Sequence, residues 1–167
     1  MKAATKTEAE FTAFVANAGP GLARTAALLT GNRTTADDLL QEALVRVYLN
    51  WPKVIPGAEK AYARRVMSNL ATDWWRRARW ERVGPPPERS VWSPTNEVDD
   101  DDAFLRHLAG LSARERAVLV LRFHADLTEA QAAEELGLPL GTVKSLAARA
   151  LAKLRTTLTL EPSGSNQ

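Results

Sequence analysis

Arginine and tryptophan side chains are interleaved along residues 60–82, and both types can bind nucleic acid. Guanidinium groups bind phosphate oxygens, and indole rings stack on unpaired bases for about 1–3 kcal/mol per base. This pattern suits single-stranded or melted nucleic acid. A solvated arginine face with tryptophans in the core explains the same pattern, so the segment alone leaves both interpretations open. The residues concerned are Arg64, Arg65, Trp74, Trp75, Arg76, Arg77, Arg79, Trp80 and Arg82.

A second group of polar side chains lies on a helix predicted at residues 142–158. Residues 141–155 contain no acidic residue, and Thr142, Ser145 and Arg149 are spaced to point away from an apolar face. A helix whose outer face lacks acids fits the major groove of DNA. The apolar face consists of Val143, Ala147, Ala150, Leu151 and Leu154.

The turn before this helix favours a helix-turn-helix. A short helix predicted at residues 129–136 is followed by Gly137, which can take the left-handed geometry of a tight turn. Thr142 is expected to cap the second helix, and the spacing of Ser112 and Glu115 predicts a capping box at the start of an earlier helix. A purely structural helical hairpin is the alternative.

Apolar spacing predicts that the N-terminal half is also helical. Gly19-Pro20-Gly21 is expected to separate two helices, and Thr35 is a plausible N-cap for the third, which Trp51-Pro52 closes. The fourth helix carries a predicted packing stripe of Tyr62, Val66, Leu70 and Trp74. The four helices are expected at about 8–18, 22–29, 35–50 and 60–82.

The net charge of +2 conceals an uneven distribution along the 167 residues. Residues 1–82 carry +5, residues 83–103 carry −5, and the remainder carries +2. The acidic piece contains three consecutive prolines and the run Asp99–Asp102, which disfavour a helix. We therefore predict an all-α protein of two small helical domains that are joined by an acidic, Pro-rich linker.

The composition argues against catalysis and against membrane insertion. Cysteine is absent, which excludes disulfides and thiol chemistry. His107 and His124 have no ligand spacing, and Asp99–Asp102 lack supporting groups for a metal, so we expect no enzyme, no metal and no cofactor. No apolar run approaches the ~20 residues that cross a bilayer, and the N-terminus lacks an apolar signal core. A cytoplasmic protein is expected.

Several segments resemble conserved regions of bacterial sigma factors of the sigma-70 superfamily. Residues 37–48 are similar to the helix of regions 2.1–2.2, and residues 62–77 are similar to regions 2.3–2.4. Residues 111–122 resemble the opening of region 4, and residues 141–155 resemble its recognition helix. The layout without regions 1 and 3 is that of the extracytoplasmic-function (ECF, group 4) sigma factors.

This resemblance implies a transcription initiation factor. Such a protein binds core RNA polymerase, directs it to promoters through the −10 and −35 elements, and melts the promoter without ATP. The implied organisation is sigma region 2 at 1–82, the linker at 83–103, sigma region 4 at 104–160 and a disordered tail at 161–167. An ordinary helix-turn-helix transcriptional regulator without a sigma role is the alternative.

The resemblance also implies which residues make contacts. Contacts with core polymerase, on the β′ clamp and the β flap, are expected from Asp38, Leu39, Gln41, Glu42, Arg46, Arg122 and Phe123. Contacts with the −10 element, where the loop after Trp51 would hold a flipped base, are expected from Trp51, Lys60, Arg64, Arg65, Val66, Asn69, Trp75, Arg76, Arg77 and Arg79. Contacts with the −35 element are expected from Thr142, Lys144, Ser145, Arg149 and Lys153.

Three further expectations depend on the same resemblance. Leu146 stands where many members have arginine, which predicts modest −35 affinity or recognition of DNA shape. The acidic linker either occupies the RNA exit channel and competes with nascent RNA, or it is a solvated spacer. Many members are held by an anti-sigma factor, which makes such a protein a further expected partner.

Overall fold

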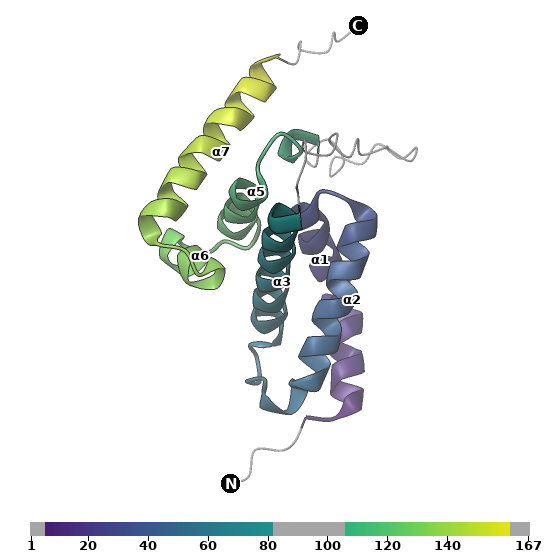
Figure 1. Cartoon of the computed structure of the whole chain (residues 1–167). Coiled ribbons are helices and arrows are strands. Elements are labelled where there is room, and N and C mark those ends of the chain that lie inside the picture. Colours follow the sequence, from purple (N-terminus) through teal and green to yellow (C-terminus); the bar gives the residue numbers. More distant parts are fainter. Residues whose placement is uncertain (1–5, 82–105, 161–167) are drawn as a thin grey trace, which may run out of the picture. The chain divides into compact units, whose positions relative to one another are not determined.

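The computed structural model describes residues 6–81 and 106–160, with the backbone alone at 78–81 and 160 (Figure 1). Both described parts contain helices and turns and no strand. The chain divides into two compact units, Met1–Glu81 (unit 1) and Arg82–Gln167 (unit 2). The expected linker at 83–103 and tail at 161–167 lie outside the described residues.

Unit 1 begins with a single long helix, α1 (Glu8–Thr30), where the sequence predicts two helices. Pro20 lies inside it, although an internal proline costs about 3 kcal/mol through a lost hydrogen bond and a steric clash. The prediction of a break is wrong because packing fixes the helix on both sides of the proline. Leu22 and Ala26 are buried after it, and Phe11 and Phe14 pack on an aromatic partner before it.

The next helix, α2 (Arg33–Leu49), is capped by Asn32 and not by Thr35. The Asn32 side-chain oxygen accepts a hydrogen bond from the Thr35 backbone N–H at 3.1 Å. Gly31, with φ of 70°, ends α1 immediately before this cap. The chain therefore needs only two residues to pass from one helix to the next.

A short 3₁₀ turn, η1 (Trp51–Lys53), separates α2 from α3 (Glu59–Glu81), close to the expected loop. The helices α1, α2 and α3 pack on one another and enclose the core of unit 1 (Figure 1). The expected stripe on α3 is displaced, since Tyr62, Val66 and Trp74 are only half-buried. The buried positions of this core are Leu22, Ala26, Leu29, Leu39, Ala43, Val47, Ala63, Met67 and Leu70.

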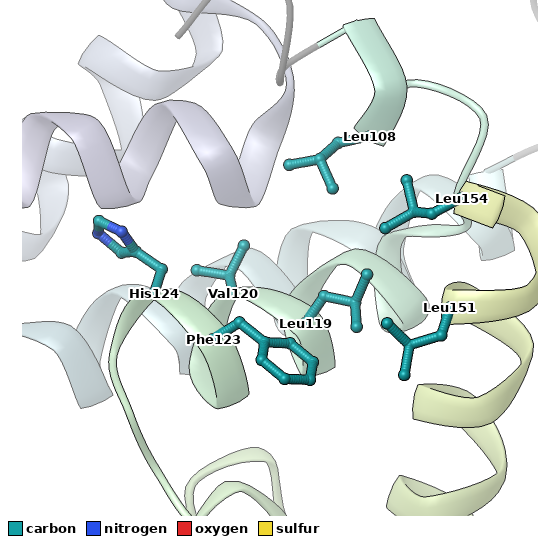
Figure 2. A pocket seen from close by; sticks show the side chains of 7 residues that line it. All are labelled: Leu108, Leu119, Val120, Phe123, His124, Leu151 and Leu154. Atoms are coloured by element: carbon teal, nitrogen blue, oxygen red, sulfur yellow. The ribbon is translucent and has the colours of Figure 1, made fainter. Parts of the chain in front are cut away.

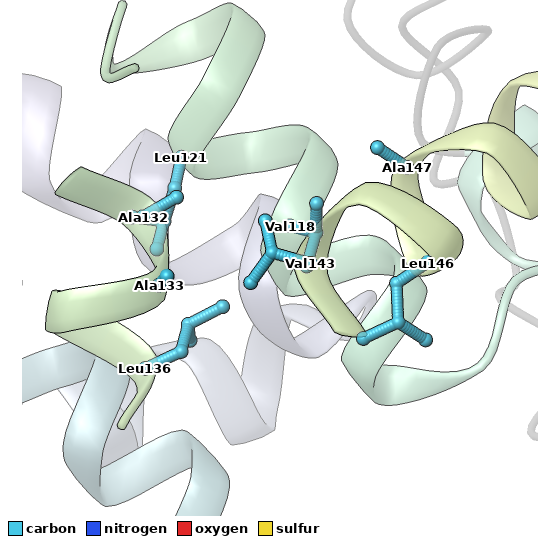
Figure 3. Packing of buried hydrophobic residues seen from close by; sticks show 8 residues of the cluster. All are labelled: Val118, Leu121, Ala132, Ala133, Leu136, Val143, Leu146 and Ala147. Atoms are coloured by element: carbon cyan, nitrogen blue, oxygen red, sulfur yellow. The ribbon is translucent and has the colours of Figure 1, made fainter. Parts of the chain in front are cut away.

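Unit 2 contains α5 (Ala113–Leu119), a wide π-helical turn η2 (Val120–His124), α6 (Glu129–Leu136) and α7 (Leu140–Leu160). Ser112 caps α5, with its hydroxyl accepting from the Glu115 N–H at 3.2 Å, but the Glu115 side chain pairs with Lys153 and not with the Ser112 backbone, so only half of the predicted capping box forms. Thr128 and Gln131 form a full capping box on α6. The core between these helices is shown in Figure 3 and consists of Val118, Leu121, Ala132, Ala133, Leu136, Val143, Leu146 and Ala147.

The helix-turn-helix has the expected turn but a longer second helix. Gly137 ends α6 with φ of 63°, and the Leu138 N–H donates to the Ala133 carbonyl at 3.0 Å. The helix α7 begins at Leu140, so Thr142 is its third residue and not its cap. The helix also continues to Leu160, two residues beyond the predicted end.

Candidate functional site

A small pocket of about 210 Å³ opens where α2 passes into α3. Its walls combine apolar surface with an amide, an ammonium and a phenol group, which is a mixture that suits the flat face and polar edge of a nucleobase. The pocket lies at the loop after Trp51 to which the resemblance assigns base capture, although none of its lining residues is among the predicted contacts. The lining residues are Asn50, Lys53, Val54, Ile55, Ala58 and Tyr62.

Trp51 does not line this pocket, and its predicted contact with the −10 element is wrong. The indole is 4% exposed and its Nε1 donates to the Thr7 carbonyl at 3.1 Å. It packs edge-to-face on Phe11, with ring centroids 5.2 Å apart. The side chain is therefore part of the core beside the pocket loop and cannot stack on a base.

The α3 helix presents a basic face that continues from the pocket. At about 100° per residue, Tyr62, Arg65, Asn69 and Arg76 lie within about 60° of one another around the helix. Arg65, Asn69 and Arg76 are exposed, and Tyr62 is half-buried at the pocket. A single strand of nucleic acid that places a base in the pocket can therefore continue along this face of α3.

The other predicted −10 residues divide by exposure. Lys60 and Arg77 are exposed, whereas Arg64, Val66 and Trp75 are half-buried. Arg64 and Trp75 also interact with other groups of the protein. The side chain of Arg79 lies outside the described atoms.

The outer face of α2 is partly as predicted and partly apolar. Asp38, Gln41 and Arg46 are exposed, Glu42 is half-buried, and the Arg46 guanidinium pairs with the Glu42 carboxylate at 3.0 Å. The predicted surface role of Leu39 is wrong, because this side chain is 0% exposed and belongs to the core.

Two apolar residues take the place of Leu39 on that face. Val45 is 58% exposed and Leu49 is 72% exposed, and both lie within about 80° of Gln41 around the helix. Sequence reasoning missed them because α2 has apolar residues on several sides, so spacing alone did not separate core from surface.

The start of α7 carries the predicted −35 residues on its outer side. Lys144, Ser145 and Arg149 are exposed and Thr142 is half-buried. The Ser145 hydroxyl donates to the Gly141 carbonyl at 3.0 Å. Leu146 is only 6% exposed and belongs to the core, so it does not occupy a DNA-facing position in this chain.

Lys153 lies more than three turns from the start of α7 and has a different partner. Its ammonium pairs with the Glu115 carboxylate at 2.8 Å, and Glu115 is buried. This ion pair joins α7 to α5. The prediction of a −35 contact by Lys153 is therefore replaced by a structural role.

An apolar groove of about 280 Å³ lies between the α5–η2 segment and α7 (Figure 2). Phe123, as predicted, is exposed at its rim, with 57% of its surface accessible. Arg122 is half-buried and donates to the Leu127 carbonyl, which holds the turn after η2, and its contact with polymerase stays a prediction. The groove is lined by Leu108, Leu119, Val120, Phe123, His124, Leu151 and Leu154.

The described residues contain neither a cluster of metal-binding side chains nor a membrane-spanning helix. Within residues 6–81 and 106–160, no three histidine, aspartate or glutamate side chains gather to hold a metal ion. In the same part of the chain, no helix has the length and apolar character to span a bilayer.

Unit 1 carries a basic helix face and unit 2 contains a helix-turn-helix, and this combination is typical of a DNA-binding protein. The Sigma-70 region 2 family matches residues 14–81, and the Sigma-70 region 4 family matches residues 107–156. The RNA polymerase sigma-E factor of Streptomyces avermitilis is 39% identical over 155 residues, which cover 89% of this chain and 85% of that protein. The ECF RNA polymerase sigma factor SigL of Mycobacterium tuberculosis is 35% identical over 144 residues, or 81% of each chain.

Solved structures show the same fold. The sigma factor RpoE of Bartonella quintana, solved in complex with the anti-sigma factor NepR, matches with a TM-score of 0.67 at 22% identity and covers 92% of this chain and 99% of its own. CnrH, solved with the cytosolic domain of CnrY, matches with a TM-score of 0.63 at 24% identity, over 93% of this chain and 92% of its own. The chain belongs to the ECF sigma factors of the sigma-70 family. It binds core RNA polymerase, directs it to promoters and initiates transcription, and the regulator without a sigma role is not favoured.

Proposed function

We propose that the pocket between α2 and α3 binds a base flipped out of the −10 element. The observation that supports this assignment is the position of the pocket, which opens onto the basic face of α3. Asn50 and Tyr62 offer hydrogen-bonding groups for a base edge, and exposed Ile55 offers an apolar surface for its face. Arg65 and Arg76 would bind the phosphates that follow.

The outer face of α2 is the proposed docking surface for the β′ clamp. A partly apolar surface edged by charges is typical of a protein interface. In this interface Val45 and Leu49 would supply the apolar contact, and Asp38, Gln41 and Arg46 would supply the polar edge. Leu39 acts from inside, by fixing α2 on the core.

Unit 2 is proposed to read the −35 element with the first turns of α7. Recognition helices contact bases mainly with their N-terminal residues, and here these are Thr142, Lys144, Ser145 and Arg149. Only Lys144 and Arg149 among these side chains are long and charged. A substantial share of recognition would therefore come from contacts with the DNA backbone and from DNA shape. In the same unit, exposed Phe123 is proposed to contact the β flap.

The whole chain is proposed to act as domains 1–82 and 104–160 with a linker at 83–103. We place it in the cytoplasm, where bacterial polymerase and chromosome meet, and we assign it a binding role without catalysis or cofactor. An anti-sigma factor is included among its proposed partners, because RpoE of Bartonella quintana has this fold and was solved with one.

Reconstitution with core polymerase tests this assignment. A library of genomic DNA fragments is transcribed by core polymerase alone, by the protein alone, and by both together. We expect specific transcripts only from the combination, and weak duplex binding by the protein alone. A protein that footprints one duplex site unaided and yields no transcript with core would contradict the sigma role.

A further inference from the structure

The loop that forms the base pocket is fastened to the segment before α1. Trp51 lies at the start of this loop, and its Nε1 donates to the Thr7 carbonyl at 3.1 Å. The same carbonyl accepts the Phe11 N–H at 3.1 Å, so it belongs to the first turn of α1. Thr7 is itself held by a capping box with Glu10. The capped start of α1 therefore holds the indole at the beginning of the pocket loop.

Lys6 connects the two ends of the pocket loop. Its ammonium lies 4.3 Å from the centroid of the Trp51 ring and 2.5 Å from Oε1 of Glu59. Glu59 is the first residue of α3 and follows Ala58, a pocket wall. One side chain thus bridges the residue where the loop starts and the residue where it ends.

The burial of Lys6 indicates that this bridge is well formed. Its side chain is only 9% exposed, which is unusual for a lysine unless it is paired. Here a carboxylate and an aromatic face both replace the lost water. The hydrogen bond from Lys6 also holds the pKa of the Glu59 carboxyl below its ordinary value of 4.5, so Glu59 is charged at neutral pH.

The bridge has two possible consequences for DNA binding. It neutralises a carboxylate next to the pocket, which would otherwise repel the phosphate backbone. It also restricts the loop that carries Lys53, Val54 and Ile55, and a restricted pocket binds its ligand with less entropic cost. The aromatic cluster of Phe11, Phe14 and Trp51 holds the first end of the loop, and the Lys6–Glu59 pair adds a side-chain contact at the second end.

We propose that Lys6 is a positioning residue that presets the −10 base pocket by bridging Trp51 and Glu59. This inference rests on the proposed function of the pocket between α2 and α3. It adds a residue that lies outside the pocket, in a segment before α1, to the groups that determine base capture.

The test uses holoenzyme assembled from core polymerase and the full chain. The probe is a single-stranded, non-template −10 oligonucleotide from a transcribed promoter, either intact or with an abasic site at the flipped position. The measured quantity is the ratio of the two affinities, which a smaller fraction of active protein does not change. We expect Lys6→Met to lower this ratio by about three- to tenfold, and Lys6→Arg to retain it, because arginine keeps the charge and the aromatic contact.

Two further variants separate positioning from simple charge effects. Lys2→Met removes the same charge from the same segment and should leave the ratio unchanged. Lys6→Met combined with Glu59→Gln removes both members of the pair, and we expect this double variant to stay defective. Recovery of the wild-type ratio in the double variant would overturn the positioning role in favour of charge neutralisation. If Lys6→Met does not form holoenzyme, Glu59→Gln alone breaks the bridge from the other side and should lower the ratio.

The pocket itself is tested separately with Tyr62→Ala. A lower ratio for Tyr62→Ala with a wild-type ratio for Lys6→Met would refute the role of Lys6 and leave the pocket assignment standing. Wild-type ratios for both variants would refute the pocket assignment, and the role of Lys6 with it.

Discussion

At the scale of single residues, two side chains of similar type have opposite roles in unit 1. Leu39 and Leu49 are both leucines of α2, yet one is 0% exposed and the other 72% exposed. The two positions are only about 80° apart around α2, and the core lies on the far side of Leu39, where Ala43 and Val47 are also buried, whereas Leu49 is turned away from it beside exposed Val45. Truncation of an exposed leucine changes the stability of the free protein very little. A large loss of binding affinity on truncation therefore indicates that the residue lies in an interface.

Leu49→Ala tests the proposed polymerase-docking face. We expect core affinity to fall by about tenfold, while the free energy of unfolding changes by no more than about 0.5 kcal/mol. Fluorescence titration of labelled protein with core polymerase gives the affinity, and thermal unfolding gives the stability. Leu158→Ala is the matched control, because Leu158 is also exposed but lies near the end of α7. Equal affinities of the two variants for core polymerase would argue against docking through this face of α2.

At the scale of elements, the sequence predicted the helix-turn-helix well and the start of the chain poorly. The turn at Gly137 and the cap at Ser112 are local signals, and local chemistry determines both in the structure. Pro20 is also a local signal, but long-range packing on both sides of it decides the outcome. The pocket shows the same difference between local and long-range determinants. Its loop could be predicted from local residues, whereas the inward orientation of Trp51 depends on a hydrogen bond to the distant Thr7.

Pro20→Ala tests whether α1 is continuous. Pro20 is exposed, so its removal should restore a helix hydrogen bond without opening a cavity. We expect the free energy of unfolding to rise by about 1–3 kcal/mol. Thermal and urea unfolding, followed by circular dichroism, measure the change. A loss of stability would indicate that the proline marks a required break.

The ion pair between α5 and α7 gives a second prediction at this scale. Lys153→Met leaves the buried Glu115 carboxylate unpaired. We therefore expect the free energy of unfolding to fall by about 1–3 kcal/mol. Lys144→Met removes the same charge from the exposed start of the helix, so it should keep stability and weaken −35 binding. Unfolding and promoter binding are measured on both variants. Equal stability with a strong loss of −35 binding in Lys153→Met would restore Lys153 as a DNA contact.

At the scale of the whole molecule, the charge distribution matches a division of labour. Residues 1–82 and the C-terminal part are basic, and both carry proposed DNA contacts, while residues 83–103 carry −5. The two proposed contact regions are each small, and most of the basic charge is cancelled over the whole chain, which leaves a net charge of +2. Long-range attraction to DNA is therefore weak for the free protein, and tight binding is expected when polymerase presents both units together.

The acidic residues of the linker, which lie outside the described residues, give the last prediction. Four adjacent aspartates repel a phosphate backbone, so a linker in the RNA exit path would compete with nascent RNA and promote release of short transcripts. If this is correct, replacing Asp99–Asp102 with serine lowers the ratio of abortive to full-length transcripts by roughly twofold. The difference should shrink at high salt, where charges are screened within about 3 Å at 1 M. Gel analysis of transcripts from one promoter at two salt concentrations measures both effects, and an unchanged ratio at low salt would identify the segment as a solvated spacer.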